Sequence, residues 1–306
     1  MSLLVIGSLA LDTIETPFGK AERTLGGSAT FISTSASYFT DEVRLVGIVG
    51  YDFPQEEIEF LRSKKIDISG LEISKTDKTF HWHGKYDFDL NTRESLVTEL
   101  NVFEKFDPII SDSFRDSKYV CLGNLHPSLQ KKVVNQIDKP KLIMCDTMNF
   151  WIDGAYDELL ETLKLVNLLV INDGEARELS GEFNLVSAAR KIMRMGPEIV
   201  IIKKGEHGAL LFTPEFIFSA PAYPLEQVFD PTGAGDTFAG GMMGWLAKTD
   251  DISDSNLKLA VIYGSTMASL AVEKFSLDGI RDLNKDIIMN RFNEFKNLTH
   301  FENASI

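Results

Sequence analysis

The 306-residue sequence predicts an α/β fold: a mostly parallel central sheet, helices on both of its faces, and a small additional β-sheet. Two observations predict this class. Short, continuously apolar, β-branched runs recur along the chain, and helix-like segments of mixed polarity separate them. A strand that is buried on both faces needs continuous hydrophobicity, and strands that alternate with helices are typical of parallel sheets.

The apolar runs predict the strands of the main sheet: LLVIGSL (3–9), VRLVGIVG (43–50), YVCLGN (119–124), KLIMCD (141–146), NLLVIN (167–172) and EIVIIKK (198–204). The segments between or after them predict helices: SATFISTSASYF, PSLQKKVVNQID, DELLETLK, LVSAARKIMRM and LKLAVIYGSTMASLAVEKF. No linker between these elements is long enough to separate an independent unit. We therefore expect residues 1–306 to form a single domain.

Two segments depart from this pattern, residues 10–25 and about 71–105. Both are polar and alternating, and the second is rich in Thr and aromatic residues, which indicates exposed antiparallel strands. We expect these strands to form a small sheet that covers the ligand-binding site as a lid. The aromatic face of the lid around Trp82 either contacts the substrate or packs against a partner chain in a homodimer.

Composition excludes several classes of partner. The chain has 45 acidic and 31 basic residues, a net charge of −14, which argues against nucleic acid or an anionic membrane. Cys121 and Cys145 lie in apolar runs and are expected to be buried in a reducing cytoplasm. The N-terminus lacks the basic residues of a signal peptide, and no uncharged run approaches the ~18 residues of a membrane span.

The segment DPTGAGDTFAGG, residues 230–241, is the most informative stretch. Consecutive small residues at Gly233, Ala234 and Gly235 contribute little to the stability of the folded protein, because glycine loses much backbone freedom on folding. Placed before a helix at the carboxyl edge of a parallel sheet, their backbone N–H groups form an anion hole, which the helix dipole strengthens. The segment matches neither a Walker A loop nor the GxGxxG pattern.

Asp236 follows this anion hole directly. A carboxylate at this position repels the bound anion, so its presence indicates a function. It can accept the proton of a hydroxyl group that attacks phosphorus. We expect the start of the helix to keep Asp236 ionised at neutral pH. The alternative is that Asp236 is only a helix N-cap.

The stretch DPTGAGDTFAGGMM resembles the C-terminal signature of the ribokinase/PfkB family of ATP-dependent carbohydrate and nucleoside kinases. Other segments resemble this family along nearly the whole chain: GSLALD (7–12), LGGSATF (25–31), INDGEARELSG (171–181) and IIKKGEHGALL (201–211). The resemblance implies a ribokinase-like fold with ATP and Mg²⁺ as cofactors. It also implies a small sugar, polyol or nucleoside as the acceptor.

On the acceptor side, the resemblance assigns Asp12 to a substrate hydroxyl group. It assigns the loop of Gly26, Gly27 and Ser28, together with Phe31, to the same substrate. Backbone N–H groups of such a loop come close to a polyol, although a glycine pair before a helix is also a common tight turn.

On the nucleotide side, the resemblance assigns Asn172 and Glu175 to ordering Mg²⁺ and its waters. Oxygen ligands at a strand end suit that ion, and the alternative is a capped helix start with a surface Glu. Lys203, Gly205 and Gly208 are assigned to the nucleotide, where the alternatives are a solvated lysine and a hairpin turn.

Asp230 and Thr232 match positions at which many members of the family bind K⁺. The alternative is that Asp230 only caps its loop. His81 and His83 flank Trp82 in HWH, and two histidines are too few for a structural zinc site.

The sequence departs from the sugar kinases of the family at three places. Ala10 and Phe31 replace two asparagines that bind sugar hydroxyls, and DTMNFW (146–151) lacks the arginine of a common motif. These changes disfavour ribose and favour an acceptor with an apolar face, for which Phe31 and Trp82 are expected to form a wall. We expect a cytoplasmic ATP-dependent kinase acting on a hydroxyl of a small sugar or polyol. A nucleoside kinase and a catalytically silent sugar-binding regulator are the alternatives.

Overall fold

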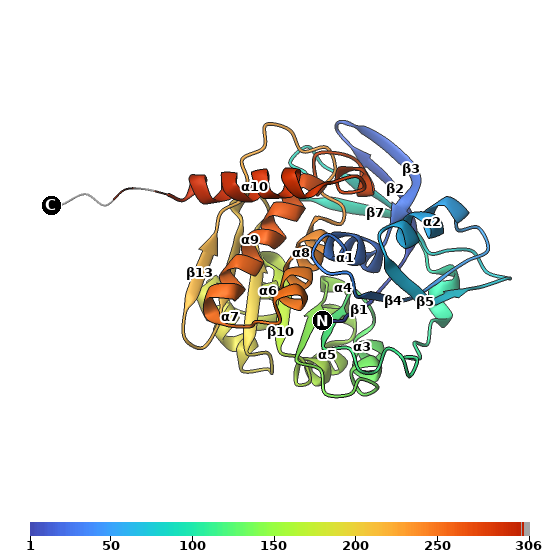
Figure 1. Ribbon diagram of the computed structural model, residues 1–306, viewed down its shortest axis with the longest axis horizontal. Coiled ribbons are helices and arrows are strands. Elements are labelled where there is room, and N and C mark those ends of the chain that lie inside the picture. Colours follow the sequence, from blue (N-terminus) through green and yellow to red (C-terminus); the bar gives the residue numbers. More distant parts are fainter. Residues whose placement is uncertain (301, 303–306) are drawn as a thin grey trace.

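The computed structural model describes residues 1–300 and 302, and within them it confirms the α/β class with two separate sheets (Figure 1). The strand order of the main sheet is β13-β12-β11-β10-β9-β8-β1-β4-β5. Neighbouring strands from β11 to β5 pair in parallel, whereas β12 and β13 add an antiparallel edge. The strands are β1 (Leu3–Ile6), β4 (Val43–Val49), β5 (Ile66–Ile73), β8 (Tyr119–Leu122), β9 (Leu142–Asp146), β10 (Leu168–Asn172), β11 (Ile199–Lys203), β12 (Ala209–Phe212) and β13 (Ile217–Ala220).

Helices cover both faces of the main sheet. One face carries α1 (Ser28–Ala36), α2 (Gln55–Ser63), α8 (Ala234–Thr249) and α9 (Asp254–Ala271), with α10 (Lys285–Leu298) packed on α9. The other face carries α3 (Pro127–Val134), α4 (Asn149–Gly154), α5 (Tyr156–Leu163), α6 (Asp173–Ser180) and α7 (Leu185–Met193). Short 3₁₀ helices cover Asn101–Lys105, Gly205–His207 and Ser276–Gly279.

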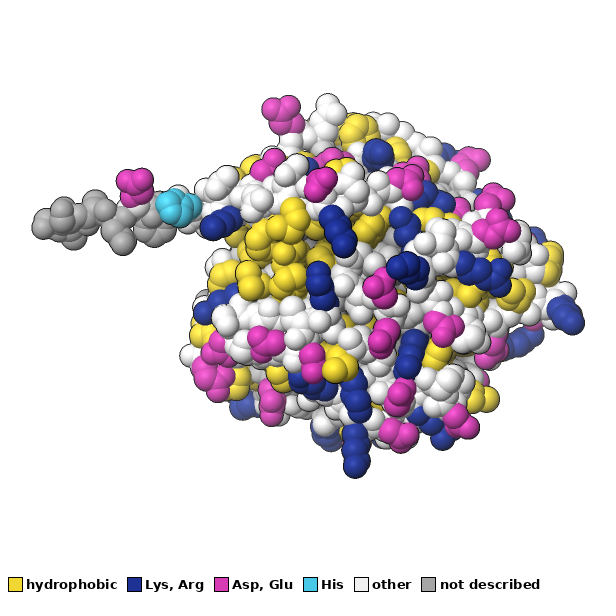
Figure 2. All heavy atoms as spheres, viewed as in Figure 1, with side chains coloured by type: hydrophobic (Ala, Val, Ile, Leu, Met, Phe, Trp, Pro, Cys, Tyr) yellow, Lys and Arg dark blue, Asp and Glu magenta, His cyan; other side chains and the backbone are white. Residues whose placement is uncertain are grey.

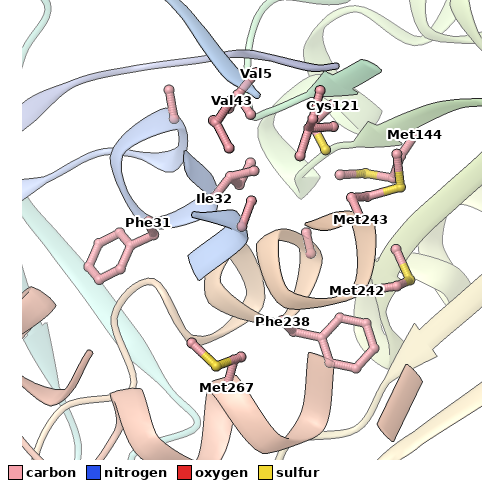
Figure 3. Packing of buried hydrophobic residues seen from close by; sticks show 14 of the residues in the cluster. Val5, Phe31, Ile32, Val43, Cys121, Met144, Phe238, Met242, Met243 and Met267 are labelled. Atoms are coloured by element: carbon pink, nitrogen blue, oxygen red, sulfur yellow. The ribbon is translucent and has the colours of Figure 1, made fainter. Parts of the chain in front are cut away.

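The hydrophobic core follows from the strand alternation. In β1, Leu3 and Val5 pack toward α1 and α8, whereas Leu4 and Ile6 belong to the cluster on the opposite face. Figure 3 shows part of the first cluster, in which the methionines of α8 and α9 lie below strand residues such as Val5. Cys121 and Cys145 are buried free thiols on opposite faces, which confirms their expected role as small core residues.

The second sheet is the predicted lid, with strand order β3-β2-β6-β7. Its strands are β2 (Ala10–Thr16), β3 (Gly19–Gly26), β6 (His81–Tyr86) and β7 (Arg93–Glu99). The expectation that the lid begins near residue 71 is wrong, because residues 66–73 form β5 and pair in parallel with β4 in the main sheet. In Figure 1 the lid strands β2, β3 and β7 stand at the upper edge of the main sheet.

The surface carries the many charged side chains that the composition indicates (Figure 2). Figure 2 shows acidic and basic side chains interspersed over the face in view, with an apolar patch beside helix α10. Within the described part of the chain, no helix combines the length and the hydrophobicity that a bilayer crossing requires.

Candidate active site

Three adjacent strands of the main sheet end in polar residues at one edge. Asp146 is the last residue of β9, Asn172 of β10 and Lys203 of β11. Asn172 and Lys203 are direct neighbours in the parallel register, and Val170 pairs with Asp146. Ligands of parallel sheets bind at this carboxyl edge.

Helix α8 begins beside this edge, at the glycine-rich segment. Gly233 is its N-cap with a φ of 72°, and no side chain caps the helix. Asp236 is therefore the third helical residue, and the alternative that it is the N-cap is wrong. Ala234 N donates to Pro231 O at 3.2 Å. Among the described residues, no group accepts a hydrogen bond from the amides of Gly233, Gly235 or Asp236, which leaves donors for an anion.

Phe31 lies beneath this helix start. Its side chain is only 1% exposed, and a Cβ atom placed on Gly233 would lie 2.4 Å from its ring. Figure 3 shows the ring pointing away from the methionines of α8 and α9. A ring this buried supports the anion loop, which is a different role from the apolar acceptor wall that the sequence predicted.

We expect Gly233→Ala to lower stability and turnover together. A left-handed conformation costs a residue with a side chain about 1–2 kcal/mol, and forcing a methyl group into the Phe31 ring adds roughly 1–3 kcal/mol. Thermal denaturation and steady-state kinetics measure both losses. Adding Phe31→Leu should recover part of the stability, and an unchanged melting temperature in the single variant would contradict the packing described here.

The ammonium group of Lys203 lies among the carboxylates of Asp146, Glu175 and Asp236. Its Nζ atom is 3.8 Å from Oδ1 of Asp146, and a Cβ atom placed on Gly235 would lie 2.6 Å from Nζ. Burial lowers the pKa of Lys203, but the three carboxylates outweigh burial and raise it. Lys203 is therefore a charged group directly beside the anion site, and a side chain at position 235 would displace it.

The carboxyl group of Asp236 has a free oxygen and a raised pKa, which suit a proton acceptor. Its Oδ1 atom is buried and has no hydrogen-bond partner among the described residues. Burial and, to a smaller extent, the charge of Asp146 raise the pKa of Asp236 to about 7, against the opposing effects of Lys203 and Arg93. The expectation that the helix end keeps Asp236 well ionised is therefore wrong, because burial outweighs it. A base whose pKa lies near the working pH is nevertheless efficient.

Asn172 and Glu175 form a capping box at the start of α6. Asn172 Oδ1 accepts a hydrogen bond from Glu175 N at 2.8 Å, and Asn172 N donates to Glu175 Oε2 at 2.9 Å. The cap was one of the expected alternatives, but Glu175 is buried rather than on the surface. The pKa of Glu175 is raised to about 7, because burial and the charge of Asp146 outweigh the opposing charge of Lys203.

Asp12, which the family resemblance assigned to the acceptor, lies in lid strand β2. A Cβ atom placed on Gly26 would lie 1.9 Å from Asp12 Oδ2, so the carboxyl group rests on the Gly-Gly loop. Its Oδ1 atom is buried without a hydrogen-bond partner among the described residues. Burial and the charge of Asp230 raise the pKa of Asp12 to about 7, and Asp236 contributes in the same direction. The effect of Asp236 on the pKa of Asp12 is the smallest of these contributions.

We expect Asp12→Asn to stabilise the protein at high pH. The pKa of Asp12 rises from an ordinary value of 3.8 to about 7 on folding, so the folded protein holds this proton more tightly than the unfolded chain. The wild type therefore loses stability as the pH rises from about 4 to about 7, whereas an amide does not titrate. Melting temperatures from pH 5 to pH 8 should show a growing advantage of the variant. A constant difference would contradict the shift.

Ser28 connects the acceptor loop to the end of β1. Ser28 N donates to Ser8 Oγ at 3.1 Å, and Ser8 N donates to Ser28 Oγ at 3.2 Å. Gly27 is the N-cap of α1, directly before Ser28. These bonds hold the loop next to Asp12, and they occupy the Ser28 hydroxyl that the sequence assigned to the substrate.

The lid contributes a second cation to the site. Thr232 Oγ1 donates to the hydroxyl of Tyr86 at 3.1 Å, which ties β6 to the anion loop. Arg93 is the partner of Tyr86 in the β6–β7 register, so both project from the same face of the lid. The pKa of Asp146 is raised by burial but lowered by Lys203 and Arg93, and Arg93 acts in the same direction on Glu175 and Asp236.

The tip of the lid reaches the turn that the family resemblance assigned to the nucleotide. A Cβ atom placed on Gly205 would lie 3.2 Å from Asn91 Oδ1. Gly205 belongs to the turn between β11 and β12, where Lys204 N donates to Gly208 O at 2.7 Å. The hairpin expected as an alternative for these glycines is thus present, and it lies in contact with the lid.

Trp82 and His83 have hydrogen-bonding partners within the lid. Trp82 Nε1 donates to Ser95 Oγ at 3.0 Å, and the ring lies over Gly84. His83 Nε2 is 3.0 Å from a carboxylate oxygen of Glu15. Trp82 is therefore braced against its own sheet.

Asp230 caps its loop. Its Oδ1 atom accepts a hydrogen bond from Thr232 N, and its Oδ2 atom accepts one from Ser276 N, both at 2.8 Å. Capping of the loop by Asp230 is the alternative to the K⁺ site that the sequence analysis left open. Both carboxylate oxygens accept hydrogen bonds from backbone amides.

Sequence reasoning missed two residues of the site. Arg93 stands among exposed lid residues with no motif around it, and only the strand register places it next to Tyr86. Asp146 was visible only as the start of a motif without its arginine, although its position at the end of a buried strand was a usable signal.

A helix start with free amides beside a buried base suits phosphoryl transfer to a hydroxyl group, and this arrangement is that of a kinase. The model of the pfkB family carbohydrate kinases matches residues 2–281, and the chain belongs to this family. It is an ATP-dependent kinase with a ribokinase-like fold.

Similar proteins include kinases of nucleosides and of sugars. A cytidine kinase of Thermococcus kodakarensis is 33% identical over 250 residues, which are 79% of this chain and 87% of the relative. A Burkholderia thailandensis nucleoside kinase in complex with inosine has a TM-score of 0.77 at 19% identity, covering 96% of this chain and 97% of that one. A putative ribokinase II of E. coli in complex with ATP and Mg²⁺ has a TM-score of 0.77 at 19% identity, covering 97% and 99%.

Proposed function

We propose that the protein transfers the γ-phosphoryl group of ATP to a hydroxyl group of a nucleoside. The observation that carries the proposal is that Asp12 and Asp236 each have a buried carboxylate oxygen that lacks a partner among the described residues. In this proposal Asp12 binds one hydroxyl group of the acceptor, and Asp236 is the base for the hydroxyl that is phosphorylated. The cytidine kinase relative and Ala10 in place of a sugar-binding asparagine favour a nucleoside over a free sugar.

The residues divide the work as follows. Asp236 takes the proton of the acceptor hydroxyl while the new bond to phosphorus forms and the bond to the ADP oxygen breaks. The amides of Gly233 and Gly235 stabilise the charge on the phosphoryl oxygens, together with Lys203 and Arg93. Catalysis of this kind consists mainly of positioning and charge stabilisation.

The residues present fit a magnesium ion that is held mainly by phosphate oxygens and water. Within the described residues, no group of three or more His, Cys, Asp or Glu side chains could hold a metal alone. Mg²⁺ usually needs only one or two carboxylates in addition to phosphates and waters. Glu175, with Asn172 beside it, is the carboxylate that we assign to this role, and the bound ion neutralises phosphate charge.

A side-by-side assay tests the acceptor. Purified protein, ATP and Mg²⁺ are incubated with cytidine, uridine, adenosine, ribose and an inositol, and ADP release is followed with mass analysis of the product. A nucleoside monophosphate formed with the highest kcat/KM supports the proposal. A higher kcat/KM for ribose or inositol would instead make the protein a sugar or polyol kinase, and no ADP release with any acceptor would support a silent regulator.

We expect the rate to depend little on K⁺. Each oxygen of the Asp230 carboxylate accepts a hydrogen bond from a backbone amide, so the carboxylate is held in place without a cation. Activity in KCl is compared with activity in a bulky organic chloride at equal ionic strength. A several-fold higher rate in K⁺ would instead support a cation site at Asp230 and Thr232.

A further inference from the structure

The carboxylate of Asp52 joins the main sheet to the lid. Asp52 lies in the loop that leads from β4 to α2, at the carboxyl edge of the main sheet. Its Oδ1 atom accepts a hydrogen bond from Thr79 N at 2.7 Å, and its Oδ2 atom accepts one from Arg23 Nη2 at 2.8 Å. We propose that Asp52 is a positioning residue that holds Asp12 in place for the acceptor, an inference that rests on the acceptor role of Asp12 in the proposed function.

The bond to Arg23 acts on the residue that follows Asp12. Strands β2 and β3 form a β-bulge at this point, because Glu22 and Arg23 together face the single residue Thr13. Such bulges re-aim side chains beside active sites. Arg23 has a φ of 48°, a left-handed conformation that is unfavourable for a residue with a side chain, and its amide donates to Thr13 Oγ1 at 3.3 Å. The ion pair with Asp52 thus holds a strained residue of the bulge.

The bond to Thr79 acts on the residue that precedes Asp12. Thr79 is 1% exposed, and it leads directly into Phe80. The carbonyl oxygen of Phe80 accepts a hydrogen bond from Leu11 N at 2.9 Å. The two oxygens of the Asp52 carboxylate therefore hold the two lid segments that are bonded to the residues on either side of Asp12.

The loop that carries Asp52 is itself fixed to the core. Phe53 N donates to Gly50 O at 3.2 Å, which closes a turn, and the Phe53 side chain is buried in the core cluster. Gly50 N donates to Thr79 Oγ1 at 2.9 Å, a second bond between this loop and the lid. Burial disfavours the charged form of Asp52, but the hydrogen bonds from Thr79 and Arg23 outweigh burial and lower its pKa. Asp52 is thus an ionised anchor of the lid on the main sheet.

Kinetics with the acceptor and with ATP test this role. Asp52→Ala removes both bonds and is expected to raise the KM for cytidine about 10-fold, as the loss of charge-assisted hydrogen bonds does, while the KM for ATP at saturating cytidine changes little. Asp52→Asn keeps an oxygen for Thr79 N and loses only the charge that binds Arg23, so its effect should be smaller. The Arg23 side chain is 50% exposed, and Arg23→Met should raise the KM for cytidine only about 3-fold.

A double-mutant cycle and a matched ion pair separate positioning from a general loss of stability. Adding Asp52→Asn to Arg23→Met should raise the KM for cytidine little beyond the larger single effect, because both changes break the same ion pair. Arg44 and Asp116 form an ion pair of the same kind at 2.6 Å near the other end of β4, so Asp116→Asn is the control and should leave this KM unchanged. Equal changes in the KM values for cytidine and ATP in Asp52→Ala, or an equal effect of Asp116→Asn, would overturn the proposal.

Hydrogen exchange gives a reading that needs no acceptor. In Asp52→Ala the amides of β2 should exchange about 10-fold faster than in the wild type, whereas those of α7 should exchange at the wild-type rate. Unchanged exchange in β2 would overturn the positioning role even if activity falls. Melting temperatures exclude misfolded variants, and Asp52→Asn provides a second reading if Asp52→Ala does not fold.

The two proposals can fail separately. If the wild type phosphorylates ribose and not cytidine, the nucleoside assignment fails, and the same KM measurements with ribose test Asp52. If the wild type phosphorylates no acceptor, the proposed function fails, and hydrogen exchange in β2 still decides whether Asp52 holds the strand of Asp12.

Discussion

Asp236→Asn is expected to lower kcat by about 10²–10⁴-fold, the usual contribution of general-base catalysis, with little change in ATP affinity. The substitution keeps the size of the side chain and its place in the first turn of α8, but an amide does not accept the hydroxyl proton. Single-turnover kinetics give the chemical step, and nucleotide titration gives the affinity.

The pH profile of the wild type provides an independent reading. Asp236 acts as a base only when deprotonated, and its pKa is raised by burial to about 7. The value of kcat/KM should therefore rise with pH up to about 7 and level off above it, and Asp236→Asn should lose this limb. The exposed Asp254→Asn in α9 is the control. Near-normal turnover of Asp236→Asn would exclude Asp236 as the base.

Arg93→Met is expected to lower kcat by roughly 10–10³-fold. A dedicated arginine finger contributes about 10³–10⁵-fold to phosphoryl transfer, and Lys203 remains here as a second cation. The lid carries Arg93 from the same face as Tyr86, whose hydroxyl contacts the anion loop. Its loss removes positive charge where negative charge develops on the phosphoryl oxygens.

The contributions of the charge and of the planar shape of the Arg93 side chain to the rate can be measured separately. Arg93→Lys keeps the charge but not the planar fork, and should recover part of the rate. Lys85→Met removes an exposed cation from the neighbouring strand β6 and should leave turnover near that of the wild type. If Arg93→Met and Lys85→Met have the same small effect, Arg93 does not act on the phosphoryl group.

The strands and the carboxyl-edge residues could be predicted because their causes are local. Continuous apolar runs that end in Asp146, Asn172 and Lys203 are visible in the sequence, as are the glycines before Asp236. The position of Arg93 depends on the pairing of β6 with β7, including a register shift between His83 and Gly84. Strict alternation along a single strand contains no information about that shift.

Phe31 shows the same limit in the core. Its hydrophobicity was consistent with a pocket wall or with burial, and the sequence offered no criterion for choosing. The contact with Gly233 joins residues about 200 positions apart, so only the packing of α1 against α8 reveals it. The pKa of Asp236 depends in the same way on burial by distant segments and not on its place in the helix.

The lid contacts of Tyr86 and Asn91 have a consequence for how the two substrates influence each other. The lid carries Asp12, which we assign to the acceptor, and it touches the anion loop through Tyr86. The turn between β6 and β7 touches, through Asn91, the turn at Gly205 that we assign to the nucleotide. If both substrates order the lid, binding of one lowers the cost of ordering it for the other. Thermodynamic linkage then requires reciprocity: the factor by which ATP tightens acceptor binding equals the factor by which the acceptor tightens ATP binding. Severing the Tyr86–Thr232 bond would reduce both factors equally, although each substrate still met every residue of its own site.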